Sequence, residues 1–253
     1  MGDADGAGRV LMRVRKAMVL CGGKATRLAA LTSDRPKPML EIGGRPLVEH
    51  TILQLAAAGV EQIGMNLYQH PDAVQHHFGD GSRFGVAMCY SIEPEPFGTA
   101  GALRVFGGML DEPFFVAYGD NLTTCDFAAL ARAHEEHRGI ATIALFWRDD
   151  VTKHSAVELQ RDMRITRFIE KPKPEEAPSH WISAGMMVLE PAVLEYVPDD
   201  GFADLGFHVF PALVAGGEKL YGYTMGDSEG LWWIDTPEDY ARVSRQWSAG
   251  FMS

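Results

Sequence analysis

The sequence predicts an α/β fold: a mainly parallel sheet flanked by helices, with a small mixed lobe added by the second half. Three observations support this prediction. Apolar runs of strand length alternate with amphipathic stretches of helix length up to about residue 120. The rhythm then changes to a strand, a hairpin and a further strand. Polar and glycine-containing segments follow the ends of the predicted strands, where ligands of such sheets bind.

In the first half, strands and helices are expected to alternate. The expected strands are Ala17–Cys21, Gln62–Tyr68, Gly85–Ile92 and Pro113–Asp120, the last of them central. The expected helices are Leu47–Val60, Asp72–Gly81 and Ala100–Leu110. Right-handed crossovers between parallel strands would bring Cys21–Thr26 and Gly119-Asp120 to one edge of the sheet.

The second half is expected to form the smaller mixed lobe. Its expected strands are Ala141–Arg148, Ala156–Gln160, Ile165–Lys171 and Trp181–Glu190, of which the middle two form a hairpin. The proline-rich segment Lys171–His180 is expected to be a loop. The last helix, Thr236–Trp247, has Thr236 as its N-cap and Pro237 at its first position. Residues 1–11 are expected to be a loose tail, and residues 12–253 one domain.

Composition argues against several classes of function. The 253 residues carry a formal net charge of −11, so a generic nucleic-acid binder, which needs a basic face, is not expected. No apolar run approaches the roughly 20 residues of a membrane span, and the polar start lacks the apolar core of a signal peptide. The three cysteines are widely separated, which is typical of free buried thiols in a reducing compartment, and a cytoplasmic location is expected.

The segment after the first strand has the chemistry of an anion site. Gly22 and Gly23 let the backbone approach a ligand and direct N–H groups at an anion. Arg27 offers a bidentate fork, and Lys37, held between two prolines, offers a point charge. Neither the P-loop pattern ending in Gly-Lys-Ser/Thr nor the G-x-G-x-x-G fingerprint is present, so the segment is a different kind of phosphate loop.

Carboxylates at strand ends suggest a metal site. Asp120 follows an apolar strand and a glycine, where a carboxylate suits Mg²⁺, which takes oxygen ligands and keeps several waters. Asp235 is a candidate second ligand, although taken alone it is better explained as a residue flanking the last helix. The small residues of Gly98–Leu103 either admit a ligand to the backbone or serve close packing. No serine–histidine or cysteine–histidine arrangement stands out, which is compatible with phosphoryl or nucleotidyl transfer.

Several blocks together resemble the sugar-1-phosphate nucleotidylyltransferases, and most of all their mannose-1-phosphate guanylyltransferase-like group. The blocks are "LCGGKATRLAALTSDRPKPMLEIGGRP", "PFGTAGALR", "YGDN", "ELQRDMRITRFIEKP", "SAGMMVLE" and "WWIDTPEDY", in the order of that family. The resemblance extends from about Lys16 to Tyr240. It implies a Rossmann-like nucleotide-diphospho-sugar transferase fold, with a nucleotide-binding half at about 16–150 and a sugar-binding half at about 151–253.

The resemblance also implies a reaction: a nucleoside triphosphate and a sugar 1-phosphate give an NDP-sugar and pyrophosphate, with Mg²⁺ as cofactor. The catalytic residues implied are Arg27 at the leaving pyrophosphate, Lys37 near the α-phosphate, and Asp120. The nucleotide-binding residues implied are Cys21, Gly22, Gly23, Lys24, Ala25, Thr26, Glu93, Gly98 and Thr99. The residues implied for the sugar phosphate are Glu170, Lys171, Ser183 and Gly185, and those for the metal are Asp120 and Asp235. Neither nucleic acid nor membrane is an expected partner, and a homodimer is compatible with the resemblance.

Three departures from the family pattern affect these expectations. Ala25 replaces the usual glycine before Thr-Arg, and because its Cβ disfavours positive φ, the loop is expected to be right-handed helical or extended there. Ser183 stands where the family often has asparagine, so a sugar contact would be shorter or water-mediated. The block around Asp235 lacks two residues, and an alignment anchored on Thr-Pro-Glu-Asp-Tyr would put the metal position on Trp233. Asp235 is preferred because a carboxylate ligates a metal and an indole does not.

The sequence leaves alternatives open for the nucleotide base, for the sugar and for the function itself. Glu93 only accepts hydrogen bonds, which suits guanine, with cytosine as a second option, whereas a neutral Gln would suit uracil or thymine better. GTP is therefore favoured over CTP, UTP and dTTP. The sugar or cyclitol phosphate is not readable from the sequence. A non-catalytic nucleotide-sensing relative is the main rival. A metal-dependent glycosyltransferase is a weaker one, because the D-x-D pattern occurs only at residues 3–5. The length makes a bifunctional enzyme with a large carboxy-terminal domain unexpected.

Overall fold

The structure, a computed structural model, describes residues 13–28 and 30–248, so the expected tail lies outside the described residues. Its strands are β1 Lys16–Leu20, β2 Glu41–Ile42, β3 Arg45–Pro46, β4 Gln62–Leu67, β5 Ala87–Ile92, β6 Phe114–Tyr118, β7 Asn121–Thr123, β8 Ala141–Trp147, β9 Ser155–Leu159, β10 Arg164–Glu170, β11 Trp181–Leu189, β12 Leu220–Thr224 and β13 Leu231–Trp233. Its α-helices are α1 Leu47–Ala57, α2 Pro71–Phe78, α3 Gly98–Val105, α4 Phe127–His137, α5 Phe210–Ala215 and α6 Pro237–Ser248.

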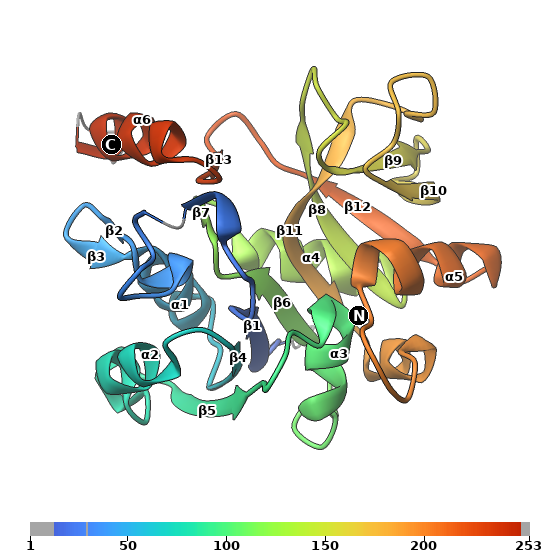
Figure 1. Cartoon of the computed structure of the whole chain (residues 1–253). Helices are drawn as coiled ribbons and strands as arrows, with labels where there is room; N and C mark the ends of the chain where they lie inside the picture. The colour runs from blue at the N-terminus through green and yellow to red at the C-terminus, as the bar shows by residue number, and fades with distance from the viewer. Residues whose placement is uncertain (1–12, 29, 249–253) are drawn as a thin grey trace, which may run out of the picture.

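One nine-stranded sheet runs through the molecule in the order β5-β4-β1-β6-β11-β8-β12-β10-β9 (Figure 1). The strands β5, β4, β1 and β6 are parallel, as expected for the first half. In the second half the sheet becomes mixed, because β11 runs antiparallel to both of its neighbours, β6 and β8, while β12 is parallel to β8. The predicted hairpin, β9 and β10, closes the far edge. Strands from both halves of the chain therefore share one sheet.

Helices cover both faces of this sheet. On one face α1, α2 and α4 contribute buried apolar side chains such as Ile52, Phe78 and Leu130 to a common core. On the other face α3 and α5 do the same with side chains such as Leu103 and Phe210. No helix in the described part of the chain is both long and apolar enough to span a bilayer. The two layers of helices leave the carboxyl ends of the parallel strands open to a ligand.

Element ends differ from the prediction by a few residues, and some elements were not predicted. Helix α1 ends at Ala57 rather than Val60, because Gly59 adopts a left-handed conformation (φ 93°) and turns the chain toward β4. The sequence pattern did not indicate α4, α5, β12, or the short strands β7 and β13. The last helix begins as predicted, because the Thr236 hydroxyl accepts a hydrogen bond from the Asp239 N–H at 3.1 Å and Pro237 occupies the first position.

The short strands β7 and β13 form a separate two-stranded sheet that positions the site. The strands are antiparallel and pair Asn121 with Trp233. Asp120 immediately precedes β7, and Asp235 lies two residues beyond β13. The ladder thus brings together two carboxylates that lie far apart in sequence.

Candidate active site

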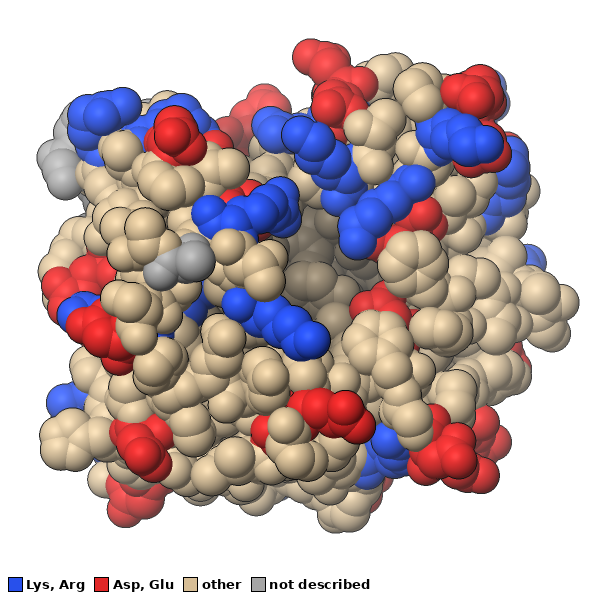
Figure 2. Space-filling view, viewed as in Figure 1, with Lys and Arg blue, Asp and Glu red and all other residues tan. Residues whose placement is uncertain are grey.

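A cavity of about 470 Å³ opens at the carboxyl ends of β1, β4 and β6. The space-filling view shows it as a hollow in the middle of one face, with Lys and Arg side chains around its rim (Figure 2). The predicted residues that line it are Cys21, Gly22, Gly23, Lys24, Ala25, Thr26, Arg27, Lys37, Glu93, Gly98, Thr99, Asp120 and Asp235. Three cations, Lys24, Arg27 and Lys37, line the cavity beside four carboxylates, so a protein with net charge −11 still offers local positive charge to an anionic ligand.

The glycine loop lies directly in front of a buried polar pair. A Cβ on Gly22 would come within 2.4 Å of the Asn66 side-chain nitrogen and 3.0 Å of a Glu93 oxygen, so only glycine fits there. The Cys21 N–H donates to Asn66 Oδ1 at 3.0 Å, which fixes the start of the loop. Among the described residues, nothing lies within 4 Å of where a Cβ on Gly23 would be, so the backbone there is open to a ligand. Burial raises the pKa of the Cys21 thiol, which therefore stays neutral.

The expectation for Ala25 is wrong. Its φ is 45°, in the left-handed region that a Cβ disfavours, and its carbonyl accepts the Leu28 N–H at 2.9 Å to start a 3₁₀ turn, Thr26–Leu28. The turn directs Arg27 toward the cavity, and an alanine in this conformation costs about 1–2 kcal/mol. The loop therefore keeps a glycine-like conformation without the glycine.

We expect Ala25→Gly to raise the free energy of unfolding by up to about 1 kcal/mol, because relief of the left-handed strain outweighs the entropy that glycine adds to the unfolded chain. Nucleotide affinity should stay equal or improve. Urea unfolding and nucleotide titration measure the two effects. A large loss of affinity would show instead that the Ala25 methyl group contacts the nucleotide.

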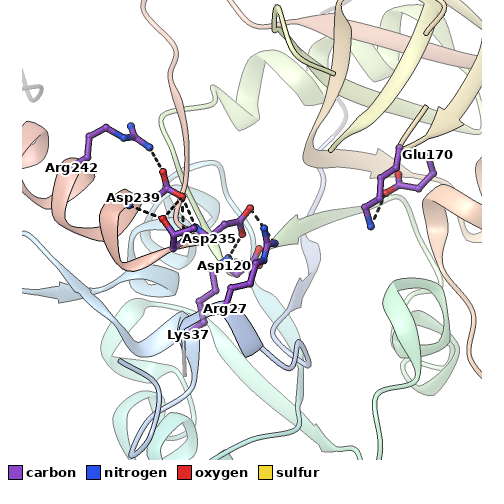
Figure 3. Close-up of polar contacts among 9 residues, drawn as sticks. Arg27, Lys37, Asp120, Glu170, Asp235, Asp239 and Arg242 are labelled. Atoms are coloured by element: carbon purple, nitrogen blue, oxygen red, sulfur yellow. Dashed lines mark hydrogen bonds and ion pairs between the residues drawn. The ribbon is translucent and has the colours of Figure 1, made fainter. Parts of the chain in front are cut away.

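Lys37 lies at the centre of the charged cluster (Figure 3). Its Nζ is 2.9 Å from Asp120 Oδ2 and 3.2 Å from Asp235 Oδ1, and only 7% of its side chain is exposed. Burial alone would lower the pKa of Lys37, but the two carboxylates more than offset this and raise it above its usual value, so the ammonium stays charged. Arg27 reaches the other oxygen of Asp235 at 3.4 Å. Two cations and two carboxylates therefore meet at the mouth of the cavity.

Local structure fixes each member of this cluster. Pro36 is extended and Lys37 begins a 3₁₀ turn, Lys37–Met39, so the lysine enters from a stiff segment. The start of α6 fixes Asp235, whose N–H donates to Asp239 Oδ2 at 3.3 Å; Asp239 is in turn held by Arg242 at 2.8 Å (Figure 3). The side chain of Asp235, not that of Trp233, reaches the cluster, in line with the preference for a carboxylate.

The two carboxylates suit a magnesium ion. One oxygen of each carboxylate lies within 3.2 Å of Lys37 Nζ. The two carboxylates are therefore close enough together to bind one cation. Over residues 13–28 and 30–248, no group of three or more His, Cys, Asp or Glu side chains forms a metal cage. Mg²⁺ commonly binds through one or two carboxylates and completes its octahedron with water and substrate phosphates. The donor set fits that mode.

Glu93 lies at the back of the cavity and is almost fully buried. Asn66 Nδ2 donates to Glu93 Oε1 at 2.9 Å, and the Phe97 N–H donates to Oε2 at 3.0 Å. Each carboxylate oxygen can accept a further hydrogen bond. Glu93 is thus a rigidly held acceptor facing the cavity.

The start of α3 packs tightly against a segment of the second half. Gly98 has φ 81°, and a Cβ there would lie 2.2 Å from the Ala203 carbonyl oxygen. The N–H groups of Ala100 and Gly101 both donate to that same oxygen, and the Thr99 hydroxyl donates to Asp204 at 2.9 Å. The small residues here therefore serve close packing between the two halves of the chain. Thr99 and Asp204, which are hydrogen-bonded to each other, both line the cavity.

Glu170, one of the four predicted sugar-phosphate residues, lies apart from the Lys37 cluster in Figure 3, and none of the four lines the cavity. Glu170 accepts a hydrogen bond from Ser155 and lies 3.5 Å from Lys171 Nζ, which is 5.4 Å from the centre of the Phe207 ring. A Cβ on Gly206 would meet the Glu170 carboxylate at 2.5 Å, so that glycine makes room for it.

Ser183 and Gly185 lie on β11 where its pairing with β8 is irregular. Gly185 has φ 80° and packs against the Tyr118 ring, which lines the cavity. Burial, followed by the charges of Asp204 and Glu170, raises the pKa of Tyr118, so its hydroxyl stays protonated. Gly185 on β11 therefore lies behind Tyr118, whose side chain lines the cavity.

A family model described as nucleotidyl transferase matches residues 16–248, nearly the whole chain. The chain belongs to the nucleotidyl transferase family. This confirms the family inferred from the motifs.

Two curated proteins are also similar to this chain. A mannose-1-phosphate guanylyltransferase of Mycobacterium tuberculosis is 36% identical over 232 residues, which cover 90% of this chain and 63% of that protein. A UTP–glucose-1-phosphate uridylyltransferase of Synechocystis sp. is 34% identical over 248 residues, 92% of this chain and 62% of that protein. The chain thus spans less than two thirds of the length of either relative.

A solved structure confirms the fold. A UDP-glucose pyrophosphorylase complexed with UDP-glucose matches with a TM-score of 0.80 at 17% identity, over 93% of this chain and 99% of the other. At that identity the likeness concerns the fold alone.

Sequence reasoning about this nucleotidyl transferase missed eight residues that line the cavity, and Asn66, Phe202 and Asp204 are three of them. Asn66 could have been found, because it is a polar residue close to the carboxyl end of a strand that is apolar from Ile63 to Met65. Asp204 carries the weaker signal of a helix cap; it accepts the N–H groups of Gly206 and Phe207 at the start of a π-helical turn, Leu205–Val209. No local pattern distinguishes Phe202 from a core residue.

Proposed function

We propose that this chain transfers a nucleotidyl group from a nucleoside triphosphate to a sugar 1-phosphate, releasing pyrophosphate and an NDP-sugar. The observation that carries the proposal is the Lys37 ammonium held between Asp120 and Asp235 beside a loop with open backbone amides. The names of the two curated relatives support the same reaction class. Residues 16–150 would bind the nucleotide and residues 151–253 the sugar.

In this proposal the glycine loop and two cations bind the triphosphate. The open backbone N–H groups around Gly23 donate hydrogen bonds to phosphate oxygens, and Arg27, which is well exposed at the rim, binds the β- and γ-phosphates. Lys37 donates to an α-phosphate oxygen, where negative charge builds up during transfer. When bound, Mg²⁺ held by Asp120 and Asp235 would supply further charge neutralisation at the phosphates.

The reaction needs positioning more than proton transfer. A phosphate oxygen of the sugar 1-phosphate attacks the α-phosphorus, a new P–O bond forms, and the bond to the β-phosphate oxygen breaks in line, so that pyrophosphate leaves with its electron pair. The attacking phosphate is already an anion, so no general base is required. Lys171 would orient that phosphate and Glu170 the sugar hydroxyls.

The test is a pyrophosphate-release assay with Mg²⁺ over a matrix of the common NTPs and several sugar and cyclitol 1-phosphates, with product masses measured. An NDP-sugar from at least one pair supports the proposal. Nucleotide binding without product from any pair would favour a nucleotide-sensing relative instead.

We infer that GTP is the preferred nucleotide, because the fixed acceptor Glu93 suits the N1–H and amino group of guanine. Glu93→Gln should lower the preference for GTP over UTP by about 10- to 100-fold, since it replaces a charged acceptor and introduces a donor. Competition assays with paired NTPs measure the ratio. Glu95→Gln, an exposed change two residues away, is the matched control. Equal turnover of all NTPs by the wild type and by Glu93→Gln would remove the basis of this inference.

A further inference from the structure

Two side chains of one loop contact the indole of Trp233. The loop 148–154 joins β8 to β9, and its first and last residues both contact the ring. The Arg148 guanidinium carbon is 4.7 Å from the centre of the Trp233 ring system, and the His154 ring centroid is 4.6 Å away with a tilt of 46°. Phe146 adds an edge contact at 6.1 Å. The loop thus forms a clamp on Trp233, made by Arg148 and His154.

One end of this clamp is attached to the residues proposed for the sugar phosphate. The His154 carbonyl accepts the Lys171 N–H at 3.0 Å. The next residue, Ser155, donates its hydroxyl to Glu170. The backbone position of Lys171 and the orientation of Glu170 therefore depend on the same few residues that hold the indole.

The other end of the clamp is attached to the carboxylate cluster. Trp233 is the last residue of β13, and it pairs across the ladder with Asn121, the neighbour of Asp120. Asp235 follows two residues later and places its carboxylate on Lys37 at 3.2 Å. Only one residue, Ile234, separates Trp233 from Asp235 along the chain. Ile234 is fully buried, so a shift of the indole would be passed on to Asp235.

We propose that Arg148 and His154 are positioning residues: by clamping Trp233 they fix the Asp235 carboxylate and couple it to the sugar-phosphate side of the cleft. This rests on the proposed function, in which Asp235 is a metal ligand. Neither residue lines the cavity, so their side chains act on the site from outside it. Burial and the nearby Arg148 lower the pKa of His154, so its ring is neutral at neutral pH and acts as a flat packing surface.

The experiment is a Mn²⁺ titration of the purified full chain, followed by water proton relaxation. Arg148→Ala and His154→Ala should each raise the Mn²⁺ dissociation constant by about tenfold, since loss of outer partners of a ligand commonly weakens metal binding by that much or more. Arg148→Lys keeps a cation over the ring and His154→Phe keeps a flat ring, so both should remain within about twofold of the wild type. A merely structural role would not separate these conservative variants from the alanine variants at equal melting temperature.

A matched control is His137→Ala, which removes a histidine stacked on Tyr221 at 4.5 Å, outside the cavity, and should leave Mn²⁺ binding unchanged. Unchanged Mn²⁺ affinity in folded Arg148→Ala and His154→Ala would overturn the clamp. If His154→Ala does not fold, Arg148→Ala decides alone, because Arg148 is exposed. Asp235→Asn separates this failure from failure of the proposed function: if that variant binds Mn²⁺ like the wild type, Asp235 is no ligand and the premise falls, whatever the clamp variants do.

Discussion

Replacing Lys37 with methionine is expected to lower kcat for nucleotidyl transfer by about 10²- to 10³-fold, the usual effect of removing one preorganised donor from a developing oxyanion. Lys37 is the buried cation of the site, and its ammonium is already aligned by two carboxylates. Pyrophosphate release at saturating substrates measures the effect. Lys16→Met, which removes a lysine paired with Asp111 outside the cavity, is the control and should change kcat less than twofold. Comparable losses in both variants would contradict the role of Lys37.

The same variant should bind Mn²⁺ more tightly than the wild type when nucleotide is absent. The ammonium holds one oxygen of Asp120 and one of Asp235, so a metal ion bound to those oxygens would lie within about 5 Å of it. Even at the dielectric constant of bulk water, that repulsion is roughly 1–2 kcal/mol, or about tenfold in the dissociation constant. Weaker binding in Lys37→Met would show that the lysine organises the carboxylates rather than competing for them.

Asp120→Asn is expected to give the second large loss, about 10³-fold in kcat, because it removes the negative charge that would bind the metal and that pairs with Lys37. Here the affinity for Mn²⁺ should fall, opposite in sign to the effect of Lys37→Met. Stability should change little, since 42% of the Asp120 side chain is exposed and its ion pair is partly screened by solvent. Activity assays, Mn²⁺ titration and thermal melting measure the three quantities.

Asp111→Asn, an aspartate paired with Lys16 outside the cavity, is the control for Asp120→Asn. Full activity of Asp120→Asn would exclude this residue from the metal site.

Much of the fold could be predicted because the first half follows simple periodic rules. Buried strands such as β1 and β6 read as continuous apolar runs, and their carboxyl ends fall where ligands of parallel sheets bind. Helix α4 escaped prediction although its buried positions, Phe127, Leu130 and Ala131, have helical spacing. Its next inward residue is His134, which is buried only because Thr142 at 2.9 Å and Glu190 at 3.2 Å satisfy its ring nitrogens. A local pattern does not reveal partners that distant.

The candidate site was predictable in its chemistry and less so in its geometry. Residue types indicated an anion site at Arg27 and Lys37 and a metal ligand at Asp120, and the family resemblance assigned all three to one site. The conformation of Ala25 was not predictable from its own steric preference, since the 3₁₀ turn that follows imposes it. The spacing around Asp235 was ambiguous for a similar reason: the β7–β13 ladder, a tertiary contact, decides which side chain points to Lys37.

The β7–β13 ladder also determines at which stage of protein synthesis the site can be completed. Ribosomal synthesis delivers β1, its glycine loop, Lys37 and Asp120 first, and these can fold with the parallel strands as they emerge. Asp235 arrives with β13, and closing a loop of more than a hundred residues onto β7 is an entropically costly late contact. Until then Lys37 has only one carboxylate partner. Under the proposed function, the nascent chain thus acquires its phosphate-binding loop well before residues 231–248 complete the proposed metal site.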